Sequence, residues 1–334
     1  MLLVAMDSQF QDHDTGSGHP ERPARLEAVR SALVQLGLDN NETRIVARRA
    51  ERADLERVHT AAYLDSLEQL CATGGGHIDG DTAVSARSWD VARLAAGTGL
   101  AAIDRLLAGD GSAALLAVRP PGHHAVRAHG MGFCLMNNIA VAAASLTALG
   151  DRVVIIDWDA HHGNGTQDIF EADPNVLYVS LHQWPLYPGT GSVNEVGSGA
   201  GRGTTINIAV PPGATGDVYL SAFDQVIEPA CERFRPDWVL ISAGFDAHRA
   251  DPLTDLGLSS GDFADLTSRA MALAPQPGRF IMFLEGGYDL EALELSVLAA
   301  ASTMMDATQR PERSTHGGPN NGAVERARDI HGLD

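Results

Sequence analysis

Cysteine is scarce in this chain of 334 residues, which contains only Cys71, Cys134 and Cys231. These three residues are widely spaced and include no Cys-x-x-Cys pair. That usage argues against a disulfide framework and against a thiolate zinc site. It is typical of a reducing compartment, so we expect the protein to be cytoplasmic.

Long apolar runs and an excess of positive charge are also lacking. The apolar start, residues 1–6, gives way to acidic and polar residues, unlike a signal peptide. No stretch approaches the ~20 apolar residues of a membrane span. With 24 Lys and Arg against 43 Asp and Glu, the formal net charge is −19. We therefore expect neither a membrane nor a nucleic acid as a direct partner, whereas a homo-oligomer stays open.

Short β-branched runs alternate with longer Ala- and Leu-rich segments, a pattern that predicts an α/β protein with a parallel sheet. The predicted strands are 2–6, 113–118, 153–157, 176–180, 205–209, 238–242 and 279–284. The predicted helices are 22–36, 53–70, 88–108, 138–149, 217–233, 260–274 and 290–304. No linker or repeat divides residues 1–309, which we interpret as a single domain. The polar residues 310–334 are interpreted as a mobile tail or a peripheral extension.

Histidine and aspartate are concentrated directly after four of the predicted strands. Open parallel sheets bind ligands outside the carboxyl ends of their strands, so these segments predict one site. In an extended segment Asp159 and His161 project to the same side, and Asp246 could supply a third ligand. Two carboxylates and one imidazole suit a divalent metal with an open coordination position. An isolated Asp-x-His more often caps a helix, but the surrounding cluster favours the metal site.

The adjacent residues His123 and His124 could move protons beside such a metal, because imidazole titrates near neutral pH. Asp157 and Asn164 could each accept a hydrogen bond from one imidazole and so set its charge. Tyr288 follows two glycines and could donate a hydrogen bond to the oxygen of a tetrahedral intermediate. A surface loop is the commoner place for a lone Gly-Gly-Tyr.

Five motifs occur in one order over residues 19–290: R-P-P-G-H-H-A, G-F-C, D-W-D-A-H-H-G-N-G-T, G-F-D-A-x-x-x-D-P-L and E-G-G-Y. The sequence thereby resembles the zinc-dependent histone deacetylase family, of the class II type to which bacterial amidohydrolases and acetylpolyamine amidohydrolases are related. The resemblance implies the arginase–deacetylase fold, a three-layer α/β/α sandwich around a central parallel sheet of eight strands.

The resemblance also implies roles for the residues of these motifs. One zinc ion per chain would be bound by Asp159, His161 and Asp246, and Tyr288 would polarise the acetyl carbonyl. His124 would act first as general base and then as acid.

The other histidine of the pair, His123, has a different implied role. His123, held by Asp157, would act mainly through its charge. A structural potassium ion would be surrounded by Asp157 and by main-chain carbonyls. Those carbonyls lie near Asp159, His161, Ser180 and Leu181.

The same resemblance implies a narrow substrate tunnel. Phe133 and Tyr187 would form its walls, and Gly132 would lie beside the acetyl group. Asp81 falls near the position that accepts a hydrogen bond from the substrate. Leu253 stands where relatives specialised for acetylpolyamines can have a glutamate, which favours an acyl-lysine substrate.

We therefore expect a metal-dependent hydrolase that removes an acetyl or related acyl group from an acyl-lysine or other N-acyl amine, a linear amide, by metal-activated water. One alternative is a two-manganese ureohydrolase of the arginase or agmatinase type. Such enzymes need a later Asp-x-Asp pair, whereas this chain has Asp246-x-His248. Another is a non-catalytic acyl-amine binding protein, which would not need Tyr288 or His124. Iron or cobalt could also replace zinc in this ligand set.

Overall fold

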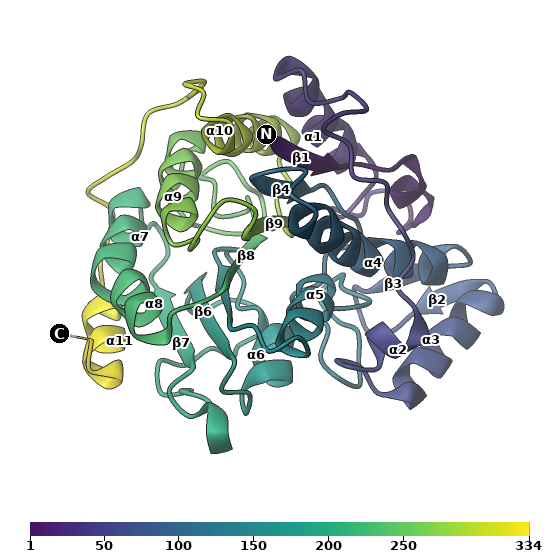
Figure 1. Ribbon diagram of the computed structural model, residues 1–334, viewed down its shortest axis with the longest axis horizontal. Helices are drawn as coiled ribbons and strands as arrows, with labels where there is room; N and C mark the ends of the chain where they lie inside the picture. Colours follow the sequence, from purple (N-terminus) through teal and green to yellow (C-terminus); the bar gives the residue numbers. More distant parts are fainter. Residues whose placement is uncertain (334) are drawn as a thin grey trace.

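A parallel sheet of seven strands forms the centre of the molecule (Figure 1), as described for residues 1–333 in the computed structural model. Its spatial order is β1-β4-β9-β8-β5-β6-β7, and every neighbouring pair is parallel. The strands are β1 (Leu2–Ala5), β4 (Ala113–Leu116), β5 (Val153–Asp157), β6 (Val176–Gln183), β7 (Thr205–Val210), β8 (Trp238–Ala243) and β9 (Phe280–Leu284). Their near-continuous burial shows that both faces of the sheet are covered. The α/β class is confirmed.

Helices cover the sheet in two layers (Figure 1). On one face α4 (Ser88–Leu107) packs against α5 (Asn138–Thr147), and α6 (Asn164–Phe170) contacts α5. On the other, α10 (Leu290–Met304) packs between α1 (Ala24–Gln35) and α9 (Ser260–Ala272). The remaining helical elements are α2 (Arg52–Leu55), α3 (Ala61–Ala72), α7 (Gly216–Ala222), α8 (Glu228–Phe234), α11 (Ala323–His331) and the short turns η1 (Ser8–Asp12), η2 (Gly199–Gly201) and η3 (Phe223–Ile227).

One predicted helix is divided in the structure, and another contains a π-helical turn. The predicted helix 53–70 becomes α2 and α3, because the side chain of Thr60 accepts a hydrogen bond from the Tyr63 amide and starts a new helix. The predicted helix 217–233 is helical throughout, as α7, the π-helical turn η3 and α8 follow one another without a break. A short hairpin, β2 (Gly75–His77) and β3 (Ala83–Ser85), was not predicted, because its strands are only three residues long and two of the three residues of β2 are glycine.

The described sheet has seven strands rather than the eight that the resemblance implied. Beside β1 the chain makes a single parallel bridge, between Arg44 and Val4. The Val4 amide donates to the Thr43 carbonyl, and the Ile45 amide donates to the Val4 carbonyl. This contact is too short to form a strand, so the edge beyond β1 is an irregular segment.

Residues 310–333 lie against the periphery of the domain, and Asp334 lies outside the described residues. Helix α11 contacts β7 and η3, with Val324 and Ala327 buried. The Glu312 carboxylate accepts hydrogen bonds from His248 Nε2 at 2.9 Å and from the Ser260 amide at 2.9 Å. The polar composition concealed this helix, because only a few apolar residues on one face dock it.

A buried ion cluster joins the N-terminal segment to the ends of two strands. The Glu21 carboxylate lies 2.7 Å from Arg119 Nε and 3.3 Å from Arg25 Nη1, and all three side chains are almost fully buried. Arg119 also donates to the main-chain carbonyls of Phe10 and His13. The two guanidinium groups hold the pKa of Glu21 below its usual value although burial opposes ionisation.

We expect Glu21→Gln to lower the free energy of unfolding by about 3–5 kcal/mol, because it leaves two buried cations without their counter-charge. Denaturant unfolding at pH 7 measures this change. The matched control is Glu27→Gln, which breaks an exposed pair with Arg30 and should cost less than about 1 kcal/mol. Equal losses in the two variants would contradict the assigned role of the cluster.

Candidate active site

Four neighbouring strands, β4, β9, β8 and β5, deliver the predicted site residues to one edge of the sheet. The loop after β4 carries His123 and His124, and the loop after β8 carries Asp246. Tyr288 follows β9, and Asp157 is the last residue of β5. Because the strands are parallel, their carboxyl ends meet, and residues distant in sequence become neighbours.

Asp159, His161 and Asp246 form a compact group whose potential ligand atoms lie within 4.8 Å of one another. His161 Nδ1 is 3.1 Å from Asp159 Oδ1 and 3.0 Å from Asp246 Oδ2. Both carboxylates are almost fully buried, and the imidazole is mostly buried. The arrangement offers one nitrogen and two oxygens to a single point.

The chemistry of this group fits a divalent cation. Burial and the neighbouring Asp159 carboxylate raise the pKa of Asp246 to about 7, so two adjacent buried anions are unfavourable without more positive charge. The backbone also leaves little room beside them: a Cβ atom at Gly286 would lie 2.2 Å from Asp246 Oδ2 and 2.6 Å from Asp159 Oδ2. Two carboxylates and one imidazole are suitable ligands for zinc.

The paired histidines have different partners and different charges. Burial disfavours the cationic form of His123, but the Asp159 and Asp157 carboxylates outweigh it and raise the His123 pKa to about 10. His123 Nδ1 is 3.0 Å from Asp157 Oδ2. His124 Nδ1 is 2.8 Å from Asn164 Oδ1, and burial, with the nearby His123, lowers its pKa well below the usual value. The structure therefore places a cationic and a neutral imidazole side by side, with ring centroids 4.0 Å apart.

Tyr288 is held at the edge of the same cluster. Its amide donates to Asp251 Oδ2 at 2.7 Å, and its ring lies 5.9 Å from Phe133 in an edge-on arrangement. The Arg25 guanidinium packs over the ring, 5.0 Å from its centroid. Burial raises the pKa of the Tyr288 phenol well above its usual value, so the hydroxyl stays protonated and can donate a hydrogen bond.

Comparison with known proteins assigns the family. Residues 19–304 match the histone deacetylase domain. The chain belongs to the histone deacetylase family. It is 40% identical over 320 residues to a probable deacetylase of Archaeoglobus fulgidus, covering 92% of this chain and 89% of that protein. It is 37% identical over 305 residues to a histone deacetylase-like amidohydrolase of Pseudomonas aeruginosa, covering 89% of this chain and 80% of the relative.

Its fold is similar to that in the crystal structure of the HDA15 HD domain, with a TM-score of 0.90 and 35% identity over 99% of this chain and 94% of the other. This likeness confirms the arginase–deacetylase fold. The relatives support a deacetylase or amidohydrolase function. Within residues 1–333, every helix is too short or too polar to span a bilayer.

Two of the residues predicted to line a substrate tunnel, Gly132 and Tyr187, lie against His124. A Cβ atom at Gly132 would lie 2.5 Å from the His124 ring, so a side chain there would collide with the imidazole. Tyr187 packs edge-on against His124, with centroids 5.2 Å apart, and is 39% exposed. Phe133 has its ring 4.7 Å from that of His19. These contacts place Tyr187 beside His124, and Phe133 beside His19 and Tyr288.

Asp81 lies on the exposed turn between β2 and β3, and its main-chain carbonyl accepts a hydrogen bond from His19 Nε2 at 3.0 Å. The turn is joined to the segment with Phe133, because the Phe133 amide donates to Thr82 Oγ1 at 3.1 Å. Leu253 is 36% exposed on the loop after Asp246.

The segments predicted to surround potassium also meet. Asp157 of β5 is paired with Ser180 of β6 in the sheet register, and Leu181 follows in β6. The Asp159 amide donates to Asp157 Oδ1 at 3.2 Å, which holds the loop after β5 close to the end of that strand. All these residues are buried.

The sequence did not assign three residues that position this site. Glu285 accepts hydrogen bonds from the amides of Gly122 and His123, and burial raises the Glu285 pKa to about 7. Arg25 donates to the main-chain carbonyls of Glu285 and Gly287, and Asp251 accepts from the Tyr288 amide. Glu285 and Asp251 lie within recognised motifs, which was a usable signal. Arg25 lies in an ordinary helical pattern and had none.

We expect chelator-stripped protein to bind one zinc ion per chain and Asp246→Asn to weaken that binding by more than about 100-fold, because loss of a ligand should exceed the effect of losing an outer partner. Direct titration with zinc measures the affinity. Asp255→Asn, an exposed carboxylate on the same loop, is the control and should bind zinc normally. Normal zinc affinity in Asp246→Asn would remove this residue from the ligand set.

Proposed function

We propose that the protein is a zinc-dependent amidohydrolase that removes an acetyl or related acyl group from an acyl-lysine or another linear N-acyl amine. The observation that carries this proposal is the convergence of a metal-ligand triad, two differently charged imidazoles and a protonated phenol on one edge of the sheet. A binding protein would need neither the proton acceptor nor the hydrogen-bond donor.

Zinc bound by Asp159, His161 and Asp246 would supply Lewis-acid polarisation of the acyl carbonyl. Tyr288 donates a hydrogen bond to the same carbonyl oxygen and stabilises its negative charge in the tetrahedral intermediate. The phenol suits this task because burial keeps it protonated.

His124 moves the protons of the reaction. Its Nδ1 faces Asn164 Oδ1, an acceptor, so Nδ1 carries the hydrogen and Nε2 has the free lone pair. Nε2 takes a proton from the attacking water as the water oxygen bonds to the acyl carbon, and returns it to the nitrogen as the C–N bond breaks. His123, held by Asp157, remains cationic and stabilises the developing negative charge.

The rim favours an uncharged aliphatic chain attached to a peptide backbone. Phe133 and Tyr187 leave an aromatic passage suited to an aliphatic chain, and Leu253 adds no charge to it. Asp81, on the exposed turn joined to Phe133 through Thr82, would accept a hydrogen bond from the substrate backbone. These features favour acyl-lysine over an acylpolyamine. A potassium ion at Asp157, Ser180 and the neighbouring carbonyls would stabilise the loop that carries the zinc ligands.

A two-manganese ureohydrolase does not fit this arrangement. The described residues contain one candidate metal group, formed by Asp159, His161 and Asp246. His248 occupies the position at which a second carboxylate would be needed, and its Nε2 is bonded to Glu312 at 2.9 Å. It is thereby directed to the C-terminal extension rather than to the metal group.

The function is tested by turnover of an acetyl-lysine peptide and an N-acetylpolyamine by protein of known metal content. We expect hydrolysis of the peptide at about one zinc per chain, with loss on chelation and recovery on adding zinc, because the triad provides a single site. Preference for the polyamine would overturn the substrate assignment. No turnover of either amide by the zinc-loaded protein would overturn the amidohydrolase itself.

We expect Tyr288→Phe to lower kcat by about 10²–10³ without loss of zinc, the effect of removing one oxyanion donor. Steady-state kinetics and metal analysis of the purified variant measure both quantities. The control is Tyr63→Phe, which removes a phenol hydroxyl that donates to the Leu135 carbonyl and should leave kcat nearly unchanged. An unaltered kcat in Tyr288→Phe would exclude the phenol from the mechanism.

A further inference from the structure

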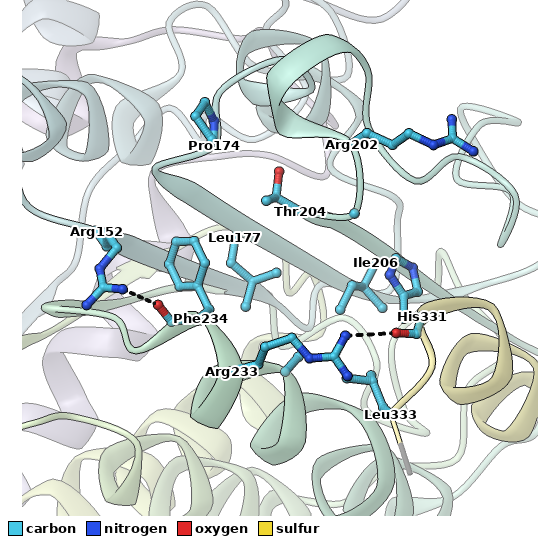
Figure 2. A pocket seen from close by; sticks show the side chains of 12 residues that line it. Arg152, Pro174, Leu177, Arg202, Thr204, Ile206, Arg233, Phe234, His331 and Leu333 are labelled. Atoms are coloured by element: carbon cyan, nitrogen blue, oxygen red, sulfur yellow. Dashed lines mark hydrogen bonds between the residues drawn. The ribbon is translucent and has the colours of Figure 1, made fainter.

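A cavity lies at the amino ends of the strands β5, β6 and β7, opposite to the carboxyl ends that carry the proposed active site. It is a cavity of about 390 Å³ whose floor is apolar, with Leu177, Ile206 and Phe234 among its lining residues. Figure 2 shows these three side chains in a row, with Arg152 at one end and His331 at the other. An adjoining hollow of about 470 Å³ shares Arg202 and His331 with it. No part of the proposed amidohydrolase site lies here.

The charge of this cavity is opposite to that of the chain. Three arginines line it, Arg152, Arg202 and Arg233, together with His331, whose pKa is lowered by burial and by Arg233, and none of the described lining residues is acidic. The whole chain has a formal net charge of −19. An all-basic cavity in so acidic a protein would attract small anions that the rest of the surface repels.

Two of the guanidinium groups are already oriented. Arg152 Nη1 donates to the Phe234 carbonyl at 2.8 Å, at the end of α8. Arg233 donates to the carbonyls of His331 and Gly332 at 3.0 and 2.6 Å, at the end of α11. Since a guanidinium has five N–H donors, these bonds fix the side chains and still leave donors for a ligand. Pre-ordered side chains lower the entropic cost of binding.

Capping of helix ends alone would account for Arg152 and Arg233 but not for two further features. Arg202 is placed on the exposed rim of the same cavity. His331 Nε2 is buried and has no hydrogen-bond partner in the part of the chain that the structure describes. A buried polar atom without a partner is costly, and a ligand atom in the cavity would satisfy it.

We propose that this cavity binds a small organic phosphate, with its flat apolar body on Leu177, Ile206 and Phe234 and its phosphate against Arg202, Arg233 and His331. Phosphate is favoured over carboxylate because a phosphomonoester carries about −1.5 to −2 charges at pH 7 and several cations surround the cavity. Arginine binds phosphate oxygens in pairs, and the volume lies within the usual range for small-molecule sites. This inference does not depend on the proposed function.

The test is calorimetric titration of the full chain with AMP, adenosine and inorganic phosphate. AMP supplies both an aromatic body and a phosphate, whereas each of the other probes supplies one of them. We expect saturable binding of one AMP per chain, at least about tenfold tighter than either partial probe and weakened by added salt. AMP binding no tighter than adenosine would overturn the role of the cations, and binding no tighter than phosphate would overturn the apolar floor.

A charge reversal identifies the site. Arg202→Glu should weaken AMP binding by at least about tenfold, and its exposed position makes it tolerable to the fold. The control Arg30→Glu changes the net charge equally at an exposed position on α1 and should leave AMP binding unchanged. Equal affinity in Arg202→Glu and the natural protein would overturn the proposal.

Hydrogen exchange locates the ligand independently of turnover. AMP should slow exchange in residues 200–206 and in α11, which form two walls of the cavity, and leave the loops with His124 and Asp246 unaffected. Protection confined to those loops would show binding at the proposed active site and would overturn the second site. The amidohydrolase proposal can fail while this result stands, because no step of the measurement requires catalysis.

Discussion

The arrangement of this site depends on two carboxylates, Asp159 and Asp246, that are buried almost completely and face the same imidazole nitrogen of His161. Desolvation makes adjacent anions unfavourable, and the high pKa of Asp246 expresses that cost. A divalent cation relieves the repulsion and brings catalytic capacity to the same point. The constraint also explains the backbone around it, because a side chain at Gly286 would collide with both carboxylates.

The residues around the two carboxylates have different hydrogen-bond partners and therefore different charges. His123 and His124 are adjacent in sequence, yet a carboxylate holds one and an amide holds the other, so one is cationic and the other neutral. Arg25 links the site to the N-terminal segment, since it donates to the main-chain carbonyl beside Tyr288, packs on the phenol ring and pairs with Glu21. The stability of this region and the orientation of the Tyr288 phenol therefore depend on the same buried ions.

The carboxyl and amino ends of the parallel strands differ in the charge of the side chains around them. At the carboxyl ends the buried carboxylates favour a metal cation, and at the amino ends the cavity lined by arginines favours an anion. Strand β5 connects them directly, because it follows Arg152 and ends at Asp157. Three arginines thus lie around one cavity in a chain whose formal net charge is −19.

The sequence by itself determined the α/β class, seven strands and the pairing of Asp159 with His161, because each depends on a local pattern: buried β-branched runs, or an acidic and an imidazole side chain two residues apart. It also determined the bounds of α10. Only the tertiary structure decided the break at Thr60, the irregular edge at Arg44 and the docking of α11. It also decided the role of Arg25, whose partners lie about 260 residues away. These features depend on contacts between distant segments, which local periodicity does not encode.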